Sequence, residues 1–356
     1  MQVQVSPKDM NQLEPTDILF QTLYWAKVKS RLGFKPLAFD IYSPSSGERS
    51  DLLVLLQHYG QDLWGAYVPQ GPEYVPYAED YGVFLEELSQ DLAQYLESRV
   101  AFIRYDLPWQ SQYAQEMLDQ NWAYFPEDRL REMRMNMGTH TWNLRKASMD
   151  MTVASTLVVD IRNSEEKILA RMKPKTRYNI GLASRKGVRV EEASQKYLPR
   201  FYELYLQTAE RNGFPVSGYE HFVALFHAHQ NYSSHPEVLF LLAWHNHQLL
   251  AGAIVGISRG TAYYLYGASS NSHRNLMGSY ALHWEAMRQA RLRGCTSYDM
   301  GAVAPAEDPQ HPFYGLYRFK TGFGGSIQIH SGSWDYPFST DKYFAFKNAD
   351  VLSRGV

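Results

Sequence analysis

Seven basic side chains and no carboxylate lie between Arg171 and Arg189, in the segment RMKPKTRYNIGLASRKGVR. This density of positive charge suits an anionic group, because lysine and arginine form charge-assisted hydrogen bonds to anionic oxygens. The charge is local, since the whole chain has 35 Lys and Arg against 37 Asp and Glu, and residues 62–98 contain eight Asp and Glu but no Lys or Arg. This asymmetry predicts an anionic partner for the basic segment. The alternative is a solvated helix face whose cations pair with carboxylates elsewhere.

Two helices are expected to carry the basic segment. Ser164 can cap the N-terminus of the first helix, which should end before Pro174. Pro174 suits the first turn of the second helix and Gly187 its C-terminal cap. On the second helix, Arg177 and Arg185 fall in one row with the spacing i, i+4, i+8.

Other elements alternate along the chain. Further helices are predicted at about 18–31, 79–98, 196–211 and 278–293, and strands at 52–59, 63–69, 100–108, 155–161, 296–301 and, as three joined strands, within 238–269. Pro108 is expected to end its strand. The order indicates an α/β fold of the α+β type, with mixed, mostly antiparallel sheets flanked by helices. The length of 356 residues suggests two domains, with a boundary near 145–155.

The composition argues against several classes of protein. The lone Cys295 cannot form an internal disulfide or a zinc cluster, which favours a reducing compartment. Residues 1–15 lack the features of a signal peptide, and the longest apolar run, Leu249–Ile257, is far shorter than the ~20 residues of a membrane helix. We therefore expect a cytoplasmic protein without a transmembrane segment.

Two short motifs resemble catalytic or metal-binding patterns, but the elements predicted around them do not support such a site. Gly256–Gly260 fits the pattern G-x-S-x-G, but a strand rather than a helix is predicted to follow, so a hairpin is expected. His245 and His247 lie in a predicted turn and have no third ligand nearby in the sequence. No metal and no cofactor are expected.

Four segments resemble the FemABX family of aminoacyltransferases, which build the peptide branch of bacterial peptidoglycan. They are WAKVK (25–29), MKPKTRYNIGLASRKGVRV (172–190), YYLYGASS (263–270) and YDMGAVAPAEDPQHPFYGLYRFKTGFGG (298–325). The last combines Y-D-x-G with G-L-Y-x-F-K-x-G-F, and the resemblance covers nearly the whole chain. It is greatest to the short, FemX-like members, which have no long coiled-coil arm.

The resemblance implies two domains similar to the GNAT acyltransferase fold. Residues 1–150, with a C-terminal return at 332–356, would bind the precursor, and residues 151–331 would face the aminoacyl-tRNA. The implied reaction transfers Gly, Ala or Ser from aminoacyl-tRNA to the stem-peptide amine of UDP-MurNAc-pentapeptide or lipid II. Because the ester is already activated, the enzyme needs only to align the two substrates, help a proton leave the attacking amine and stabilise the developing oxyanion. A lipid-linked acceptor would require a peripheral approach to the membrane.

The resemblance also assigns roles to single residues. Lys320 matches a lysine that the family needs for activity and could hold the oxyanion or the leaving tRNA hydroxyl; a surface lysine beside an aromatic strand is the alternative. Asp106 matches an aspartate near the acceptor that could receive or orient the amine; a turn cap before Pro108 is the alternative. The basic segment becomes a candidate tRNA contact. The residues assigned to this contact are Lys175, Arg177, Arg185 and Lys186.

The remaining implied site residues concern substrate binding. Lys29, and less directly Lys27, match a lysine that contacts the nucleotide-sugar part of the precursor. Tyr266 matches a tyrosine of the same groove, and Phe319 adjoins Lys320. Arg211 matches a motif at a helix end, where a structural cap is expected more than a ligand contact.

Departures from the family leave the acceptor open. Relatives that use the soluble precursor carry arginine in place of Ser217 and tyrosine in place of His221, and many have Gln-Pro where this chain has Val153-Ala154. Both the soluble and the lipid-linked precursor therefore stay possible. Two other functions remain as alternatives: acyl-CoA-dependent transfer, for which His273–Gly278 is a poor pyrophosphate turn, and a non-catalytic module that binds precursor or RNA.

Overall fold

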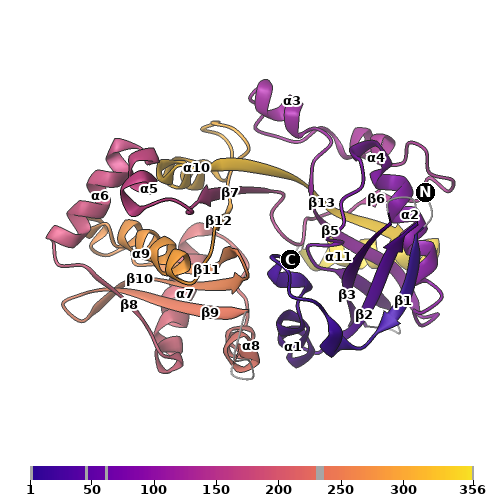
Figure 1. The fold of residues 1–356 in the computed structure, drawn as a ribbon, viewed down its shortest axis with the longest axis horizontal. Coiled ribbons are helices and arrows are strands. Elements are labelled where there is room, and N and C mark those ends of the chain that lie inside the picture. Colours follow the sequence, from indigo (N-terminus) through magenta and orange to yellow (C-terminus); the bar gives the residue numbers. More distant parts are fainter. Residues whose placement is uncertain (1–2, 45–46, 61–62, 230–235, 355–356) are drawn as a thin grey trace. The chain divides into compact units, whose positions relative to one another are not determined.

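The computed structural model describes residues 3–44, 47–60, 63–229 and 236–354 (Figure 1). The chain forms two compact units, each of which is described by itself. Unit 1 contains the described residues of 1–14, 20–154 and 329–356, and unit 2 contains 15–19 and 155–328. The short segment 15–19, which the sequence analysis placed in the first domain, belongs to unit 2.

Unit 1 is built on a mixed sheet. Its strands, in spatial order, are β1 (Gln4–Lys8), β2 (Lys35–Ser43), β3 (Glu48–His58), β4 (Trp64–Val68), β5 (Val100–Gln110) and β13 (Ser326–Pro337, from Ile329 onward), and β6 (Arg145–Lys146) pairs with β13. Of these pairs, β4 with β5 is parallel, and the others are antiparallel.

Helices cover both faces of the unit 1 sheet at β5. The helices of this unit are α1 (Leu23–Arg31), α2 (Tyr81–Leu92), α3 (Ala114–Asp119), α4 (Asp128–Met135) and α11 (Thr340–Arg354). Phe84 of α2 shares a core cluster with Ile103 and Tyr105 of β5. Phe346 of α11 packs on Phe102 of β5, with 4.6 Å between the ring centroids. Phe102 lies on the opposite face of the sheet from Ile103, because successive side chains of a strand point to opposite faces. β5 is thus buried on both faces, which explains its nearly continuous apolar run.

The strand predicted at 100–108 continues to Gln110, so the expectation that Pro108 ends it is wrong. The register between β5 and β13 shifts at this point: Leu107 pairs with Gly332 and Gln110 with His330. Two residues of β5 therefore face one of β13, which is a bulge. A bulge tolerates proline because the missing N–H falls where the ladder is already interrupted.

Unit 2 is also built on a mixed, mostly antiparallel sheet. Its strands, in spatial order, are β7 (Ser155–Asp160), β12 (Ser297–Ala302), β11 (Thr261–Ser269), β10 (Gln248–Ser258), β9 (Glu237–His245) and β8 (Arg189–Glu192). β11 and β12 are parallel, while the other neighbours are antiparallel. The three joined strands predicted within 238–269 are confirmed, including the hairpin at Gly256–Gly260.

Helices lie on both faces of the unit 2 sheet (Figure 1). They are α5 (Glu165–Arg171), α6 (Pro174–Arg185), α7 (Leu198–Asn212), α8 (Tyr219–His229), α9 (Gly278–Leu292) and α10 (Tyr314–Lys320). Ala251 and Ala253 share a core cluster with α9, whereas Phe201 of α7 comes within 2.7 Å of where a Cβ on Gly252 would lie. Alternation along β10 therefore separates the two helices onto opposite faces.

The predicted fold class, an α/β fold with mostly antiparallel sheets, is confirmed. The longest helices of the described residues have 15 residues, so this part of the chain contains no long coiled-coil arm. No helix in the described ranges combines the length and the apolar character that crossing a bilayer requires.

Candidate active site

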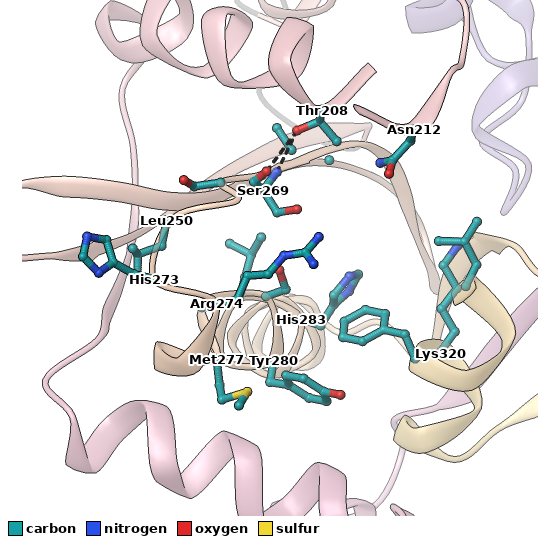
Figure 2. Close-up of a pocket in the computed structure, with 18 of the residues that line it drawn as sticks. Thr208, Asn212, Leu250, Ser269, His273, Arg274, Met277, Tyr280, His283 and Lys320 are labelled. Carbon is teal, nitrogen blue, oxygen red and sulfur yellow. Dashed lines mark hydrogen bonds between the residues drawn. The ribbon is translucent and has the colours of Figure 1, made fainter. Parts of the chain in front are cut away.

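Unit 2 contains a cavity of about 640 Å³. Its walls come from the end of α7, the end of β11, the loop 270–277, the first turns of α9, and α10 (Figure 2). The cavity therefore forms where segments more than 100 residues apart in the sequence meet.

Lys320 lies in the wall of this cavity, at the end of α10. It is 4% exposed, and its Nζ donates a hydrogen bond of 2.6 Å to the carbonyl of Ala302. Burial lowers its pKa to about 8, against the opposing charge of Asp299. Lys320 is thus still mostly a cation at pH 7. The alternative of a surface lysine beside an aromatic strand is wrong, because the residue is buried and helical.

A bulge in β12 places the groups around Lys320. Gly301 has a φ of +69°, and the register of β12 against β7 shifts between Asp299 and Ala302. Glycine adopts this left-handed conformation without the clash of a Cβ. The turned N–H of Gly301 donates 2.7 Å to the carboxylate of Asp299, and Ala302 then offers its carbonyl to Lys320. This is a physical reason for the Y-D-x-G motif.

Burial raises the pKa of Asp299 to about 6, against the hydrogen bond from Gly301 and the charge of Lys320. The two environments therefore bring the pKa values of a carboxyl and an ammonium group close to neutrality. Shifted titrations of this kind are typical of functional sites, although structural ion networks also produce them.

Aromatic rings form the wall beside Lys320. Phe319 packs against Tyr280, His283 and Phe323, with ring centroids 5.0, 5.5 and 5.3 Å apart. His283 is 3% exposed, and its Nδ1 lies 3.1 Å from the hydroxyl of Tyr298. Burial, and then the charge of Lys320, lower the pKa of His283 to about 3. The imidazole is therefore neutral at pH 7.

The cavity has a positive character. Among the described residues that line it there is no aspartate or glutamate, whereas Arg274 and Lys320 contribute cations. Figure 2 shows the guanidinium of Arg274 turned toward the side of the pocket where His283 and Lys320 lie. The N-terminus of α9 at Gly278 adds the positive end of a helix dipole. The site is thus suited to a ligand with an anionic group.

The basic segment lies next to the loop that lines this cavity. Lys175, Arg177, Arg185 and Lys186 are exposed on α6 and at its end. Lys186 donates 3.0 Å to the carbonyl of Asn275, within the loop 270–277. Arg177 instead donates to the carbonyls of Ala170 and Met172, so it caps the end of α5.

Arg211 lies at the end of α7, outside the cavity lining. Its guanidinium donates 2.7 Å to the carbonyl and 3.0 Å to the hydroxyl of Ser269. Burial, followed by the charge of Arg274, lowers its pKa. These contacts attach the end of α7 to the end of β11.

Tyr266 also lies outside the cavity lining. Its hydroxyl is 2.7 Å from Nε2 of His221, and its ring packs on Phe222 and Tyr205, 4.8 and 6.2 Å between centroids. His221 thus contacts Tyr266, although its residue type departs from that of the family relatives.

In unit 1, Asp106 is buried at 1% exposure within a group of hydroxyl donors. Thr152 donates 2.6 Å to one carboxylate oxygen, and Ser333 donates 2.9 Å to the other. The hydroxyl of Tyr67 lies 3.4 Å away, and Gln70 donates to Thr152. Burial outweighs these hydrogen bonds and raises the pKa of Asp106 to about 6.

Lys29 and Lys27 lie on α1 of the same unit, and both are half-buried. Nζ of Lys29 is 5.1 Å from the ring centroids of both Trp25 and Phe34. Burial lowers its pKa to about 8. The indole N–H of Trp25 is buried and has no hydrogen-bond partner among the described residues. The neighbourhood of Lys29 therefore retains an unused donor.

A family comparison classifies the chain. The FemAB family model matches residues 11–244 and 240–350, which together are most of the sequence. The chain belongs to the FemAB family.

Curated relatives of this FemAB-family protein are known. The lipid II:glycine glycyltransferase of Staphylococcus saprophyticus subsp. saprophyticus is 34% identical over 116 residues, which are 33% of this chain and 26% of that protein. The lipid II:glycine glycyltransferase of Staphylococcus haemolyticus is 23% identical over 249 residues, 53% of this chain and 59% of that protein. The chain therefore matches less than two thirds of the length of either relative.

Solved structures share the fold of this FemAB-family protein. The crystal structure of FemX aligns over 94% of this chain and 96% of its own, with a TM-score of 0.71 and 18% identity. A tandem GNAT protein from the clavulanic acid biosynthesis pathway aligns over 94% and 98%, with a TM-score of 0.51 and 11% identity. The prediction of a GNAT-like fold is confirmed.

Three side chains of this candidate site were not identified from the sequence. Asp299 was noted as part of Y-D-x-G but received no role, and Arg274 was considered only as part of a poor pyrophosphate turn. His283 carried no signal, because one histidine on an amphipathic helix resembles an ordinary core residue. Burial against Lys320 distinguishes it, and burial is visible only in the folded chain.

Proposed function

We propose that the protein transfers an amino acid, with glycine as the first candidate, from aminoacyl-tRNA to the stem-peptide amine of a peptidoglycan precursor. The observation that carries this proposal is the positively charged cavity of unit 2, with the ammonium group of Lys320 in its wall. Membership of the FemAB family supports the acceptor class, and the names of the curated relatives support glycine and lipid II.

The chemistry needs few protein groups. The amine nitrogen attacks the ester carbon, the carbonyl oxygen takes up negative charge, and the bond to the ribose oxygen then breaks. The ammonium of Lys320 uses one hydrogen bond on Ala302, so two N–H donors remain for an oxygen of the ester. A buried cation stabilises developing charge more strongly than the same cation would in water.

A mass measurement tests the proposal. The full-length protein is incubated with charged bulk tRNA and, separately, with UDP-MurNAc-pentapeptide or lipid II in detergent. We expect a mass increase of one glycine residue on lipid II, absent when the tRNA is uncharged or treated with ribonuclease. A shift on the soluble precursor with a different residue mass would retain the reaction but change acceptor and donor.

The competing functions have their own outcomes in this test. Transfer of an acetyl mass from acetyl-CoA, with no transfer from charged tRNA, would replace the proposal by acyl-CoA-dependent transfer. Binding of either precursor without any mass change from either donor would replace it by a non-catalytic module.

The surface of α6 gives a separate prediction on tRNA binding. We expect the double variant Lys175→Glu and Arg185→Glu to raise the KM for charged tRNA about tenfold. The KM should also depend less on salt, because fewer counterions leave the tRNA on binding when fewer cations contact its phosphates. Arg177 is left unchanged because it caps α5. The measurement is KM between about 50 and 200 mM salt.

A matched control is Lys196→Glu with Lys342→Glu, which changes the net charge equally at exposed positions outside α6. If the α6 variant and this control have the same salt slope as the wild type, α6 does not contact the tRNA.

A further inference from the structure

His283 is held in one orientation in the wall of the unit 2 cavity. Its ring centroid lies 4.6 Å from that of Tyr264 and 5.5 Å from those of Phe319 and Phe323. Figure 2 shows it among the side chains that surround the pocket, on the same side as Lys320. The ring is therefore fixed by packing before any ligand binds.

The hydroxyl of Tyr298 decides which ring nitrogen of His283 carries the proton. Tyr298 is fully buried, and Nδ1 of His283, 3.1 Å away, is the one hydrogen-bond partner of its hydroxyl among the described residues. A buried hydroxyl without an acceptor loses the hydrogen bond it makes with water in the unfolded chain. The Tyr298 hydroxyl thus donates to Nδ1, and the neutral imidazole carries its proton on Nε2.

The neutral state follows from the surroundings. Burial and the nearby charge of Lys320 both disfavour an imidazolium ion. Nε2 has no hydrogen-bond partner among the described residues, while the ring lines the cavity. His283 therefore presents an N–H donor to a ligand, and its lone pair on Nδ1 is already occupied.

We propose that His283 is a second hydrogen-bond donor of the transfer reaction, which binds the ester oxygen that becomes negative, and that it is not a general base. The inference rests on the proposed function. In the step it assists, the amine nitrogen bonds to the ester carbon and an electron pair moves to the carbonyl oxygen. The bond to the ribose then breaks, and the amine proton ends on the ribose oxygen. His283 neither gains nor loses a proton.

Three variants separate this role from packing. Glutamine in His283→Gln keeps an N–H donor near the position of Nε2, whereas His283→Met keeps volume without a donor. We expect a turnover within about fivefold of wild type for His283→Gln, a loss on the order of 10²-fold for His283→Met, and an unchanged KM for tRNA in both. Tyr298→Phe should lower turnover to an intermediate level, and His247→Gln, in an exposed turn, is the matched control.

A second measurement does not depend on transfer activity. Long-range nitrogen–proton NMR spectra of the full-length protein with ¹⁵N-labelled histidine identify the tautomer of each ring, and the His283→Gln spectrum assigns His283. We expect an unprotonated Nδ1 and a protonated Nε2, with the Nδ1–H form appearing in Tyr298→Phe. A non-hydrolysable glycyl amide of 3′-amino-3′-deoxyadenosine is then added, and we expect the Nε2 signal to shift.

Each outcome decides one of the two proposals. The Nδ1–H tautomer in the wild type would overturn the role of His283, whatever the activity. A His283→Met enzyme with near-normal turnover would also overturn it. If the wild type transfers nothing, the proposed function fails, and the amide titration decides on His283: an Nε2 shift retains it as a ligand donor, and no shift removes it.

Discussion

Lys320→Met is expected to lower turnover by about 10²–10³-fold, the usual cost of removing one donor to a developing oxyanion. The physical reason is that Lys320 is 4% exposed in the cavity wall, and within the described residues the one hydrogen-bond acceptor of its ammonium group is Ala302. Methionine has a similar length, but it leaves the carbonyl of Ala302 without its donor and the buried carboxyl of Asp299 without the nearby cation. The variant should therefore lose some stability, because removing one of two neighbouring buried charges is destabilising.

The measurement combines steady-state turnover with the melting temperature, and Lys342→Met, at an exposed position of α11, is the control. The wild type should lose activity as the pH rises through about 8, because Lys320 loses its proton there. Turnover is compared at a temperature at which both proteins are folded, and a Lys320→Met enzyme with turnover within threefold of wild type would contradict the catalytic role.

Asp106→Asn is expected to lower turnover on the order of 10²-fold and to remove the loss of stability that the wild type shows between about pH 4 and pH 6. Burial raises the pKa of Asp106 to about 6, so the carboxyl is suited to accept a proton near neutrality. The folded state binds this proton more tightly than the unfolded chain does, so wild-type stability falls as the pH rises from about 4 to about 6. The asparagine variant lacks this cost, which is on the order of 3 kcal/mol.

Denaturant unfolding of both proteins between pH 4 and 8 checks the stability part, with Asp119→Asn, at an exposed carboxylate, as control. The difference in unfolding free energy should grow up to about pH 6 and then stay constant. The acid limb of the wild-type activity profile near pH 6 should disappear in Asp106→Asn. Unchanged turnover in Asp106→Asn would make Asp106 a structural residue rather than a proton acceptor.

Local sequence signals were sufficient for many elements. Pro174 and Gly187 mark the start and end of α6, and Ser164 stands at the N-cap of α5, although its side chain makes no cap hydrogen bond. These signals are reliable because they act on the residue's own backbone: proline fixes φ at its position, whereas glycine allows a positive φ.

Other elements were missed where local preference and tertiary contacts disagree. The stretch Tyr314–Lys320 is rich in aromatic residues and was considered as a strand, yet it forms α10. Aromatic residues favour strands mainly through packing, so their preference changes with the surroundings. The sequence analysis also assigned no element to the strand β13 or to the helix α8.

The sequence by itself determined the family, through motifs whose residues are neighbours in the sequence, such as Y-D-x-G and G-L-Y-x-F-K-x-G-F. Only the tertiary structure decided which side chains are buried next to them. Lys320 meets the carbonyl of a residue 18 positions earlier, and Asp106 accepts hydrogen bonds from Thr152 and from Ser333, 46 and 227 positions away. The pKa shifts of Lys320, Asp106 and His283 arise from this burial, and burial depends on contacts between distant segments, which a local pattern does not encode.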